Sequence, residues 1–356
     1  MKILLFEWLT GGGKWIEDQS AQSSPDPISG DGEPSPQSGM SRQGHAMLSA
    51  ITTDFLDAGI EVVTLIDHRD QFLDHVKLKK IEISSADDLK TKLVDTASKV
   101  NHVMLIAPES NGRLTDCIDW LGSSQHKLIS PDAEFAKFAS CKQSTVLRLQ
   151  AGDFDLFPQG VLLSHFLAGT KRFDHPGPVV LKPTDGAGSE NVHLITEWDN
   201  SKCQNSAPFA EQRKSLLAPL EHVWQHAPDR FRIESLVSGT PVSVSVLCGA
   251  RDSQILAPTI QVFDKEPFGE YVKAEVNVDP DISLRAIQLA TKVVNVLPPT
   301  RGYIGLDLVI SDQSSEQDVL IEINPRLTMS YLQLREIYPD LATSMFKKAV
   351  EGKRKS

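Results

Sequence analysis

The sequence predicts an α/β domain followed by a longer α+β region, and three observations support this fold class. Its 356 residues are too many for one ordinary domain and suit two or three. Up to about residue 130, short apolar strands alternate with amphipathic helices, which is typical of a parallel sheet covered on both faces. Beyond that point the alternation stops, and strands joined by turns predict antiparallel pairing.

The elements of the first domain follow from its hydrophobic pattern. Met1–Glu7 has the pattern of a buried strand and leads into Thr10-Gly11-Gly12-Gly13. A helix is predicted around Met47–Leu56, because the apolar side chains of this stretch fall on one helical face, and Gly59 ends it. The remaining predicted elements are the strands Ile60–Ile66, His102–Ile106 and Lys127–Ile129 and the helices Ala86–Val100 and Thr115–Leu121.

A polar stretch separates the first strand from the first helix. Of the 24 residues from Asp18 to Ser41, seven are Ser, four are Pro and three are Gly. Such a segment has too little apolar surface to offset the entropy of ordering it. Residues 14–40 are therefore predicted to be a mobile insertion.

The second half is predicted to be α+β. Asp132–Leu149 has a helical pattern, and two strands form a hairpin around a Gly-rich loop. Further apolar strands follow, and two amphipathic helices lie among and after them. In chain order the strands are Val179–Leu181, Asn191–Ile195, Arg230–Val237, Val242–Leu247, Ile304–Ile310 and Val319–Ile323, and the helices are Ile282–Val296 and Leu341–Val350.

Composition excludes several classes of protein. The formal net charge of −11 argues against a chain that mainly coats nucleic acid or anionic lipid. No apolar run approaches the ~20 residues of a membrane span, and the N-terminus lacks the pattern of a signal peptide. The four cysteines have no zinc or redox spacing, which favours a reduced cytoplasmic protein. From the charge and the lack of a membrane span we expect no nucleic-acid or membrane partner.

Two common nucleotide signatures are absent. Gly13-Lys14 resembles the end of a P-loop, but Trp8 stands where the first glycine belongs and Trp15 replaces the Ser or Thr. Gly186 and Gly188 lack the third glycine of a dinucleotide fingerprint and join two strands instead of a strand and a helix. Neither a P-loop kinase nor a dinucleotide oxidoreductase fits.

A set of spaced residues points to phosphate binding. Lys182 ends a strand and opens the loop that contains Gly186, Gly188 and Ser189, where glycine backbone N–H groups can close over phosphate oxygens. Taken alone, a hairpin turn with a surface lysine explains this motif equally well. Lys142 lies at a helix start and, taken alone, is a surface lysine. The backbone of the strand with Glu234, Ser235 and Leu236 could hydrogen-bond an adenine edge, but taken alone it is an ordinary strand.

The most specific cluster is a candidate metal site. Asp307 lies inside an apolar strand, and Glu322 and Asn324 point to one face of the next strand. Buried acids are costly unless a cation neutralises them, and carboxylate and amide oxygens suit Mg²⁺ on nucleotide phosphates. The alternative is a salt bridge to Arg326 or another base.

Together these residues resemble the ATP-grasp superfamily in their order and spacing. The resemblance implies a Rossmann-like N-terminal (pre-ATP-grasp) domain over 1–131 and a two-lobed ATP-grasp fold, with lobes at 132–237 and 238–356. It implies ATP binding by Lys142, Lys182, the Gly-rich lid and Glu234–Leu236. It implies Mg²⁺ or Mn²⁺ on Asp307, Glu322 and Asn324, with Lys182 and Arg326 as catalytic residues.

The N-terminus resembles a narrower group. Phe6-Glu7-Trp8, Thr10–Gly13, Ser41–Leu48 and Ile106–Glu109 are similar to ATP-grasp proteins of methylotrophic bacteria and to archaeal ligases that join tyramine to glutamate in methanofuran biosynthesis. This resemblance implies an ATP-dependent carboxylate–amine ligase that works through an acyl phosphate on small-molecule substrates, and it leaves a homodimer open. An amino-acid or peptide ligase of another pathway and a non-catalytic ATP-binding regulator are the alternatives.

Two acids at strand ends of the first domain have open roles. Glu7 and Glu109 lie where open α/β sheets bind ligands, so either could recognise a substrate ammonium. Each could equally cap a helix or a turn. Trp8 beside Glu7 could offer an apolar wall to an aromatic amine, although a Trp at a strand end is more often part of the core.

Overall fold

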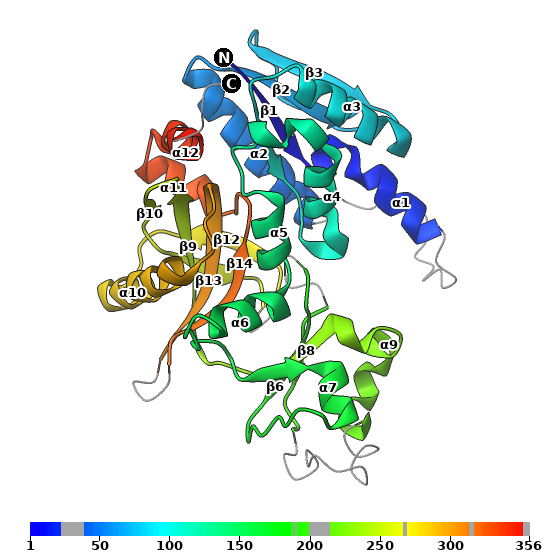
Figure 1. The fold of residues 1–356 in the computed structure, drawn as a ribbon, viewed down its shortest axis with the longest axis vertical. Helices are drawn as coiled ribbons and strands as arrows, with labels where there is room; N and C mark the ends of the chain where they lie inside the picture. The colour runs from blue at the N-terminus through cyan, green and yellow to red at the C-terminus, as the bar shows by residue number, and fades with distance from the viewer. Residues whose placement is uncertain are drawn as a thin grey trace.

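The computed structural model contains three sheets, and it describes residues 1–22, 39–186, 188, 191–198, 214–265, 269–312 and 317–351. Figure 1 shows a parallel sheet at one end, a small antiparallel sheet at the other end and the largest sheet between them. This combination of a parallel N-terminal sheet with antiparallel sheets confirms the predicted fold class. No helix in the described residues has both the length and the apolarity that crossing a membrane requires.

The N-terminal sheet is parallel and covered on both faces, as its alternating pattern predicts. Its elements are β1 (Lys2–Glu7), α2 (Gly39–Asp57), β2 (Glu61–Asp67), β3 (Leu78–Ile83), α3 (Ala86–Ser98), β4 (His102–Ile106) and α4 (Arg113–Trp120). The strands lie in the order β3-β2-β1-β4. Successive side chains of a strand point to opposite faces. Ile3 and Leu5 of β1 therefore pack against α2, and Leu4 and Phe6 pack with α3 and α4.

For this domain one predicted strand is wrong, and one strand of the sheet was not predicted. Lys127–Ile129 is not a strand: it makes a single bridge, Leu128 to Val103, because the 3-10 turn Gly122–Lys127 occupies the residues before it. The edge strand β3 was not predicted, since its lysines and glutamate face solvent and hide the apolar alternation.

The predicted insertion begins with a helix, which follows a short turn after β1. Leu9–Gly13 forms a π-helical turn that Gly12 permits with a φ of 103°. Helix α1 (Lys14–Gln22) follows directly, so residues 14–22 of the predicted insertion are helical. Trp15 explains why this segment is ordered, because its ring stacks on His68 and lies 4.0 Å from the Arg69 guanidinium. Residues 23–38 lie outside the described part of the chain.

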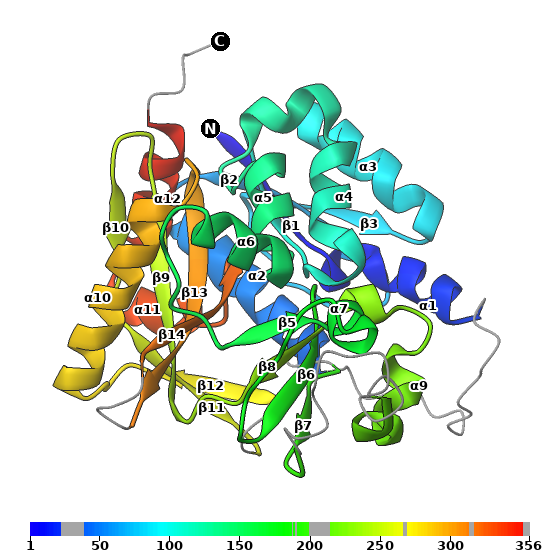
Figure 2. The same cartoon turned by 60° about the horizontal axis from the view of Figure 1, so that its bottom comes forward.

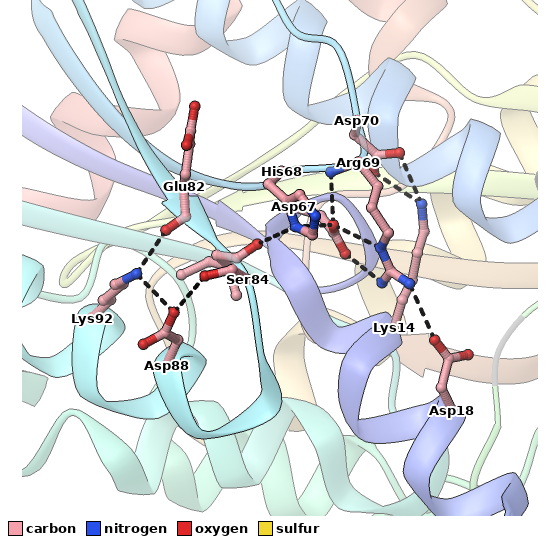
Figure 3. A network of polar contacts seen from close by, with 11 residues as sticks. Lys14, Asp18, Asp67, His68, Arg69, Asp70, Glu82, Ser84, Asp88 and Lys92 are labelled. Carbon is pink, nitrogen blue, oxygen red and sulfur yellow. Dashed lines mark hydrogen bonds and ion pairs between the residues drawn. The ribbon is translucent and has the colours of Figure 1, made fainter.

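A polar network ties α1 to the end of β2 (Figure 3). Lys14 Nζ lies 2.9 Å from Asp70, and Arg69 pairs with both Asp67 and Asp18. Asp67 is fully buried and accepts hydrogen bonds from the Arg69 backbone N–H, Nε and Nη2 at 3.0, 2.9 and 2.6 Å. The network fastens α1 to the turn that follows β2.

We expect Asp67→Asn to destabilise the protein at pH 7 by about 1–3 kcal/mol, because a buried charge-assisted bond to Arg69 is weakened. Burial alone would raise the pKa of Asp67, but the hydrogen bonds and charge of Arg69 outweigh it and lower the pKa. A lowered pKa means that this stability is present above the ordinary Asp pKa of about 3.9 and is lost as the pH falls through the folded value. Thermal unfolding at several pH values should show the two proteins converging in acid. A constant difference between them from pH 7 to pH 3 would contradict this.

The small antiparallel sheet carries the predicted hairpin. Its order is β5-β8-β6-β7, and β6 (Val179–Pro183) pairs with β7 (His193–Ile195) as predicted. The predicted helix Asp132–Leu149 is instead two helices that break at Ser140-Cys141. The break lets the Lys142 backbone N–H donate to Thr184 O at 2.7 Å, which joins the second helix to the end of β6. The other bounds are α5 (Ala133–Ala139), α6 (Lys142–Gln150), β5 (Gly160–Leu162), α7 (Leu163–Ala168), α9 (Glu221–Trp224) and β8 (Phe231–Ser235).

The large antiparallel sheet separates a hydrophobic face from a polar face. Its order is β12-β11-β9-β13-β14, with β10 paired to β9 (Figure 2). Leu306 and Leu308 of β13 pack under helix α10, so Asp307 between them faces the opposite side. The bounds are β9 (Gly239–Cys248), β10 (Ser253–Ile255), β11 (Thr259–Phe263), β12 (Tyr271–Glu275), α10 (Pro280–Val296), β13 (Gly302–Ser311), β14 (Val319–Asn324), α11 (Tyr331–Ile337) and α12 (Leu341–Val350).

Candidate active site

A cavity of about 640 Å³ lies between the two antiparallel sheets. Its walls come from β6 and β8 on one side and from β9 and β11 to β14 on the other. The cavity brings together every predicted site residue except Ser189, which lies outside the described residues. Those that line it are Lys142, Lys182, Gly186, Gly188, Glu234, Ser235, Leu236, Asp307, Glu322, Asn324 and Arg326.

Lys182 is held at the end of β6 by a buried acid. Its Nζ lies 2.5 Å from Glu234 Oε2, and Arg232 Nε donates to the other oxygen of Glu234 at 2.7 Å. Burial lowers the pKa of Lys182 and outweighs the attraction of Glu234. Burial would raise the pKa of Glu234, but Lys182 and Arg232 lower it. The site thus keeps a carboxylate between two basic side chains.

Two backbone donors of the segment Glu234–Leu236, which was predicted to contact an adenine edge, already have partners within the protein. The Ser235 backbone N–H donates to Gln159 O at 2.8 Å, and that of Leu236 donates to Pro178 O at 3.0 Å. These two donors are therefore used within the protein. A contact between this segment and an adenine edge would have to use its carbonyl groups or Val237, which also lines the cavity.

The candidate metal ligands meet as the register of β13 and β14 requires. Asp307 lies directly opposite Glu322, and Asn324 Nδ2 donates to Asp307 Oδ2 at 2.8 Å. Gln261 Nε2 donates to the other oxygen of Asp307 at 3.1 Å. Lys142 Nζ lies 2.7 Å from Glu322 Oε2.

Electrostatics at this pair favour a cation. Burial and then the neighbouring Glu322 carboxylate raise the pKa of Asp307 to about 7. Burial would also raise the pKa of Glu322, but the charge of Lys142 lowers it. Within the described residues no three His, Cys, Asp or Glu side chains could hold a metal by themselves. Two carboxylates and one amide oxygen nevertheless fit a hard divalent cation that takes its remaining ligands from phosphates or water.

The salt bridge offered as the alternative to metal binding is present, but it is made by Lys142 with Glu322 and not by Arg326. Arg326 Nε and Nη2 donate to Glu109, with the shortest contact at 2.9 Å, and not to Asp307 or Glu322. Arg326 lines the cavity beside the acids, where it can face an anionic group.

Glu7 and Trp8 have structural roles. Glu7 is 3% exposed and accepts from the backbone N–H groups of Leu9 and Thr10 at 3.2 and 2.7 Å, so it caps the π-helical turn. Trp8 is fully buried, and its Nε1 donates to Glu17 at 2.8 Å. Neither lines the described cavity, so the hypothesis that they bind an aromatic amine is not supported.

Several lining residues were not identified from the sequence. They are uncharged and lie on the side of the cavity formed by β11, β12, the start of α2 and the segment after Arg326: Gln43, Gln261, Phe263, Tyr271, Thr328, Met329 and Ser330. Thr328–Ser330 could have been found, because they lie within four positions after Arg326. Gln261 and Tyr271 carry no such signal, since they look like ordinary strand residues.

Known proteins show which class of domain this site belongs to. Residues 166–330 match the ATP-grasp domain, so the chain contains an ATP-grasp domain. It is also similar over most of its length to a tyramine--L-glutamate ligase of Methanocaldococcus fervens, with 25% identity over 88% of this chain and 92% of that protein. A tyramine--L-glutamate ligase of Methanocaldococcus jannaschii is 22% identical over 86% of this chain and 83% of that protein. The predicted resemblance to ATP-grasp ligases is confirmed.

A solved structure supports the same fold. A putative ATP-grasp superfamily protein from Archaeoglobus fulgidus superposes with a TM-score of 0.63 at 17% identity. The match covers 97% of this chain and 88% of that one. The likeness therefore extends beyond the matched domain to the N-terminal sheet.

Proposed function

We propose that the protein is an ATP-dependent ligase that joins a carboxylate to an amine and releases ADP and phosphate. One observation carries the proposal: a single cavity gathers two largely buried lysines, an arginine and a pair of carboxylates with an amide. Shielded bases suit the phosphates of ATP, and the acids suit the cation that accompanies it. No side-chain nucleophile is needed, because the γ-phosphate itself activates the substrate.

The proposed reaction has two steps. A carboxylate oxygen of the first substrate attacks the γ-phosphorus, and the bond to ADP breaks. The amine nitrogen then attacks the acyl carbon, phosphate leaves with the transferred oxygen, and the nitrogen loses a proton. Lys142 and Lys182 would neutralise oxygens of the transferring phosphoryl group, and Arg326 would hold the acyl phosphate or the substrate carboxylate.

The ion pairs within the cavity suggest how the site accepts its ligands. Mg²⁺ or Mn²⁺ held by Asp307, Glu322 and Asn324 would supply charge neutralisation for the β- and γ-phosphates. Lys142 can then exchange its Glu322 partner for a phosphate oxygen. Lys182 can likewise turn to a phosphate oxygen, because Glu234 then still keeps Arg232 as a partner.

For the substrates, we propose glutamate as the carboxylate and tyramine or a similar aromatic amine. Both curated relatives are tyramine--L-glutamate ligases. The uncharged wall of the cavity supports an aromatic amine, since Phe263, Tyr271 and Met329 offer apolar surface for a ring.

The test is a ligation assay with mass detection of the product. With ATP, Mg²⁺, glutamate and tyramine, we expect one ADP and one phosphate for each amide formed, and no turnover without either substrate. If the protein ligated other amino acids but not this pair, the proposed substrates would be refuted and the proposed ligase activity would stand. Formation of AMP and pyrophosphate would refute the acyl-phosphate route.

A further inference from the structure

The short loop Glu109–Gly112 connects strand β4 of the N-terminal sheet to helix α4, and its Glu109 forms an ion pair with Arg326 of the cavity wall. Arg326 Nε lies 3.0 and 3.2 Å from the two Glu109 oxygens, and Nη2 lies 2.9 Å from Oε2. Glu109 is 4% exposed and does not itself line the described cavity. Two parallel contacts fix the plane of a guanidinium, which a single contact does not.

The same loop also holds the root of the Gly-rich lid. The Asn111 backbone N–H donates to Asp185 Oδ2 at 2.9 Å. Arg230 Nη2 donates to Asn111 Oδ1 and to Asp185 Oδ2, both at 3.0 Å. Asp185 directly precedes Gly186 of the lid, so the loop contacts the point from which the lid extends.

The backbone of the loop is unusual at both residues that turn it. Asn111 and Gly112 have φ values of 54° and 72°, in the left-handed region. Asn is one of the few residues with a side chain that tolerates this conformation, at some energetic cost. Such a turn persists where surrounding contacts hold it. Glu109 and the Asn111 amide, two residues apart, thereby reach Arg326, which follows β14, and Asp185, which follows β6.

We propose that the loop Glu109–Gly112 sets Arg326 and the lid root in one fixed arrangement, so that Glu109 and Asn111 are positioning residues for phosphoryl transfer. The inference rests on the proposed function, because it assigns Arg326 and the lid to that step. It gives the N-terminal sheet a part in catalysis although its loop does not touch the reacting groups. Disturbing the loop should therefore slow the reaction more than it weakens ATP binding.

The first test compares two carboxylates that both link the N-terminal part to the C-terminal part. Asp54 on α2 accepts from Arg335 on α11 at 2.9 and 3.0 Å, outside the cavity wall. We expect Glu109→Gln to lower kcat by about 10- to 100-fold, since a small misplacement of a catalytic group has effects of this size. The KM for ATP should change by less than about threefold. Asp54→Asn should lower the Tm and leave kcat unchanged.

Equal effects of the two variants on kcat, or a Glu109→Gln enzyme with normal kcat, would overturn the proposal. Glu109→Asp keeps the charge and shortens its reach, so it serves as the second variant if the amide impairs folding. It should show the same separation of kcat from KM.

The second test measures coupling between the two ends of the loop. Glu109→Gln, Asp185→Ala and the double variant are compared in acyl-phosphate formation, trapped with hydroxylamine. If the loop couples the lid root to Arg326, the rate of the double variant falls by a smaller factor than the product of the two single-variant factors. Losses that multiply would show two independent contacts and overturn the proposal.

This cycle can also be measured if the ligase proposal fails. Should no substrate pair give product or acyl hydroxamate, the cycle is repeated in the free energy of unfolding, measured by denaturant titration. Non-additive losses of stability would then support the coupling alone, and additive losses would exclude it.

Discussion

Asp307→Asn should abolish Mg²⁺-dependent turnover and at the same time stabilise the ligand-free protein. Asp307 contributes a carboxylate to the candidate metal pair, and loss of a group that stabilises the transferring phosphate costs about 10²- to 10³-fold in rate. Its charge is unfavourable without a cation, because burial and Glu322 raise its pKa to about 7. The substitution keeps the size of the side chain and removes that charge.

The effect on stability should depend on pH with a defined sign. A carboxyl group whose pKa is raised on folding loses stability as the pH rises from its unfolded value, about 3.9, to its folded value. The variant should therefore gain little at pH 4, gain progressively up to about pH 7 and then level off. Asp252→Asn, which removes an exposed acid paired with Lys348, is the control and should show no such gain. Normal Mg²⁺-dependent activity in Asp307→Asn would refute the metal site.

Lys182→Ala should weaken ATP binding and slow the chemical step by about 2–4 kcal/mol in all, the size expected for a charge-assisted phosphate contact in a closed site. The fold should tolerate the change, because Glu234 keeps Arg232 as a partner. Calorimetry gives the ATP affinity and single-turnover kinetics give the rate. Lys80→Ala, at an exposed pair with Asp74, is the control. Unchanged affinity together with an unchanged rate would remove Lys182 from the site.

Local pattern was enough to predict much of the fold and the acids of the site. The face Met47–Leu56 and the alternation of apolar residues around Asp307 depend on periodicity alone, and both lie as predicted. Asp307 and Glu322 were recognisable because acids interrupt apolar strands. The domain limits at 131 and 237 and the roles of the site residues remain predictions.

Other features depend on contacts that local pattern does not contain. Glu109 and Arg326 are 217 positions apart, and the residues around each of them do not indicate that the two pair. Helix α1 was missed because its order comes from His68 and Arg69 on another element and not from its own apolar content. The segment around Leu128 has the composition of a strand, but it makes a single β-bridge and no continuous strand pairing.

Oxygen transfer from the substrate to phosphate distinguishes the proposed mechanism from its alternatives. Glutamate carrying ¹⁸O in both of its carboxylates is ligated in unlabelled water, and the released phosphate is analysed by mass spectrometry. An acyl-phosphate route places one labelled oxygen in each phosphate and leaves one in the amide, because the carboxylate oxygen that attacks the γ-phosphorus departs with it. Unlabelled phosphate, or label recovered in AMP, would contradict the mechanism.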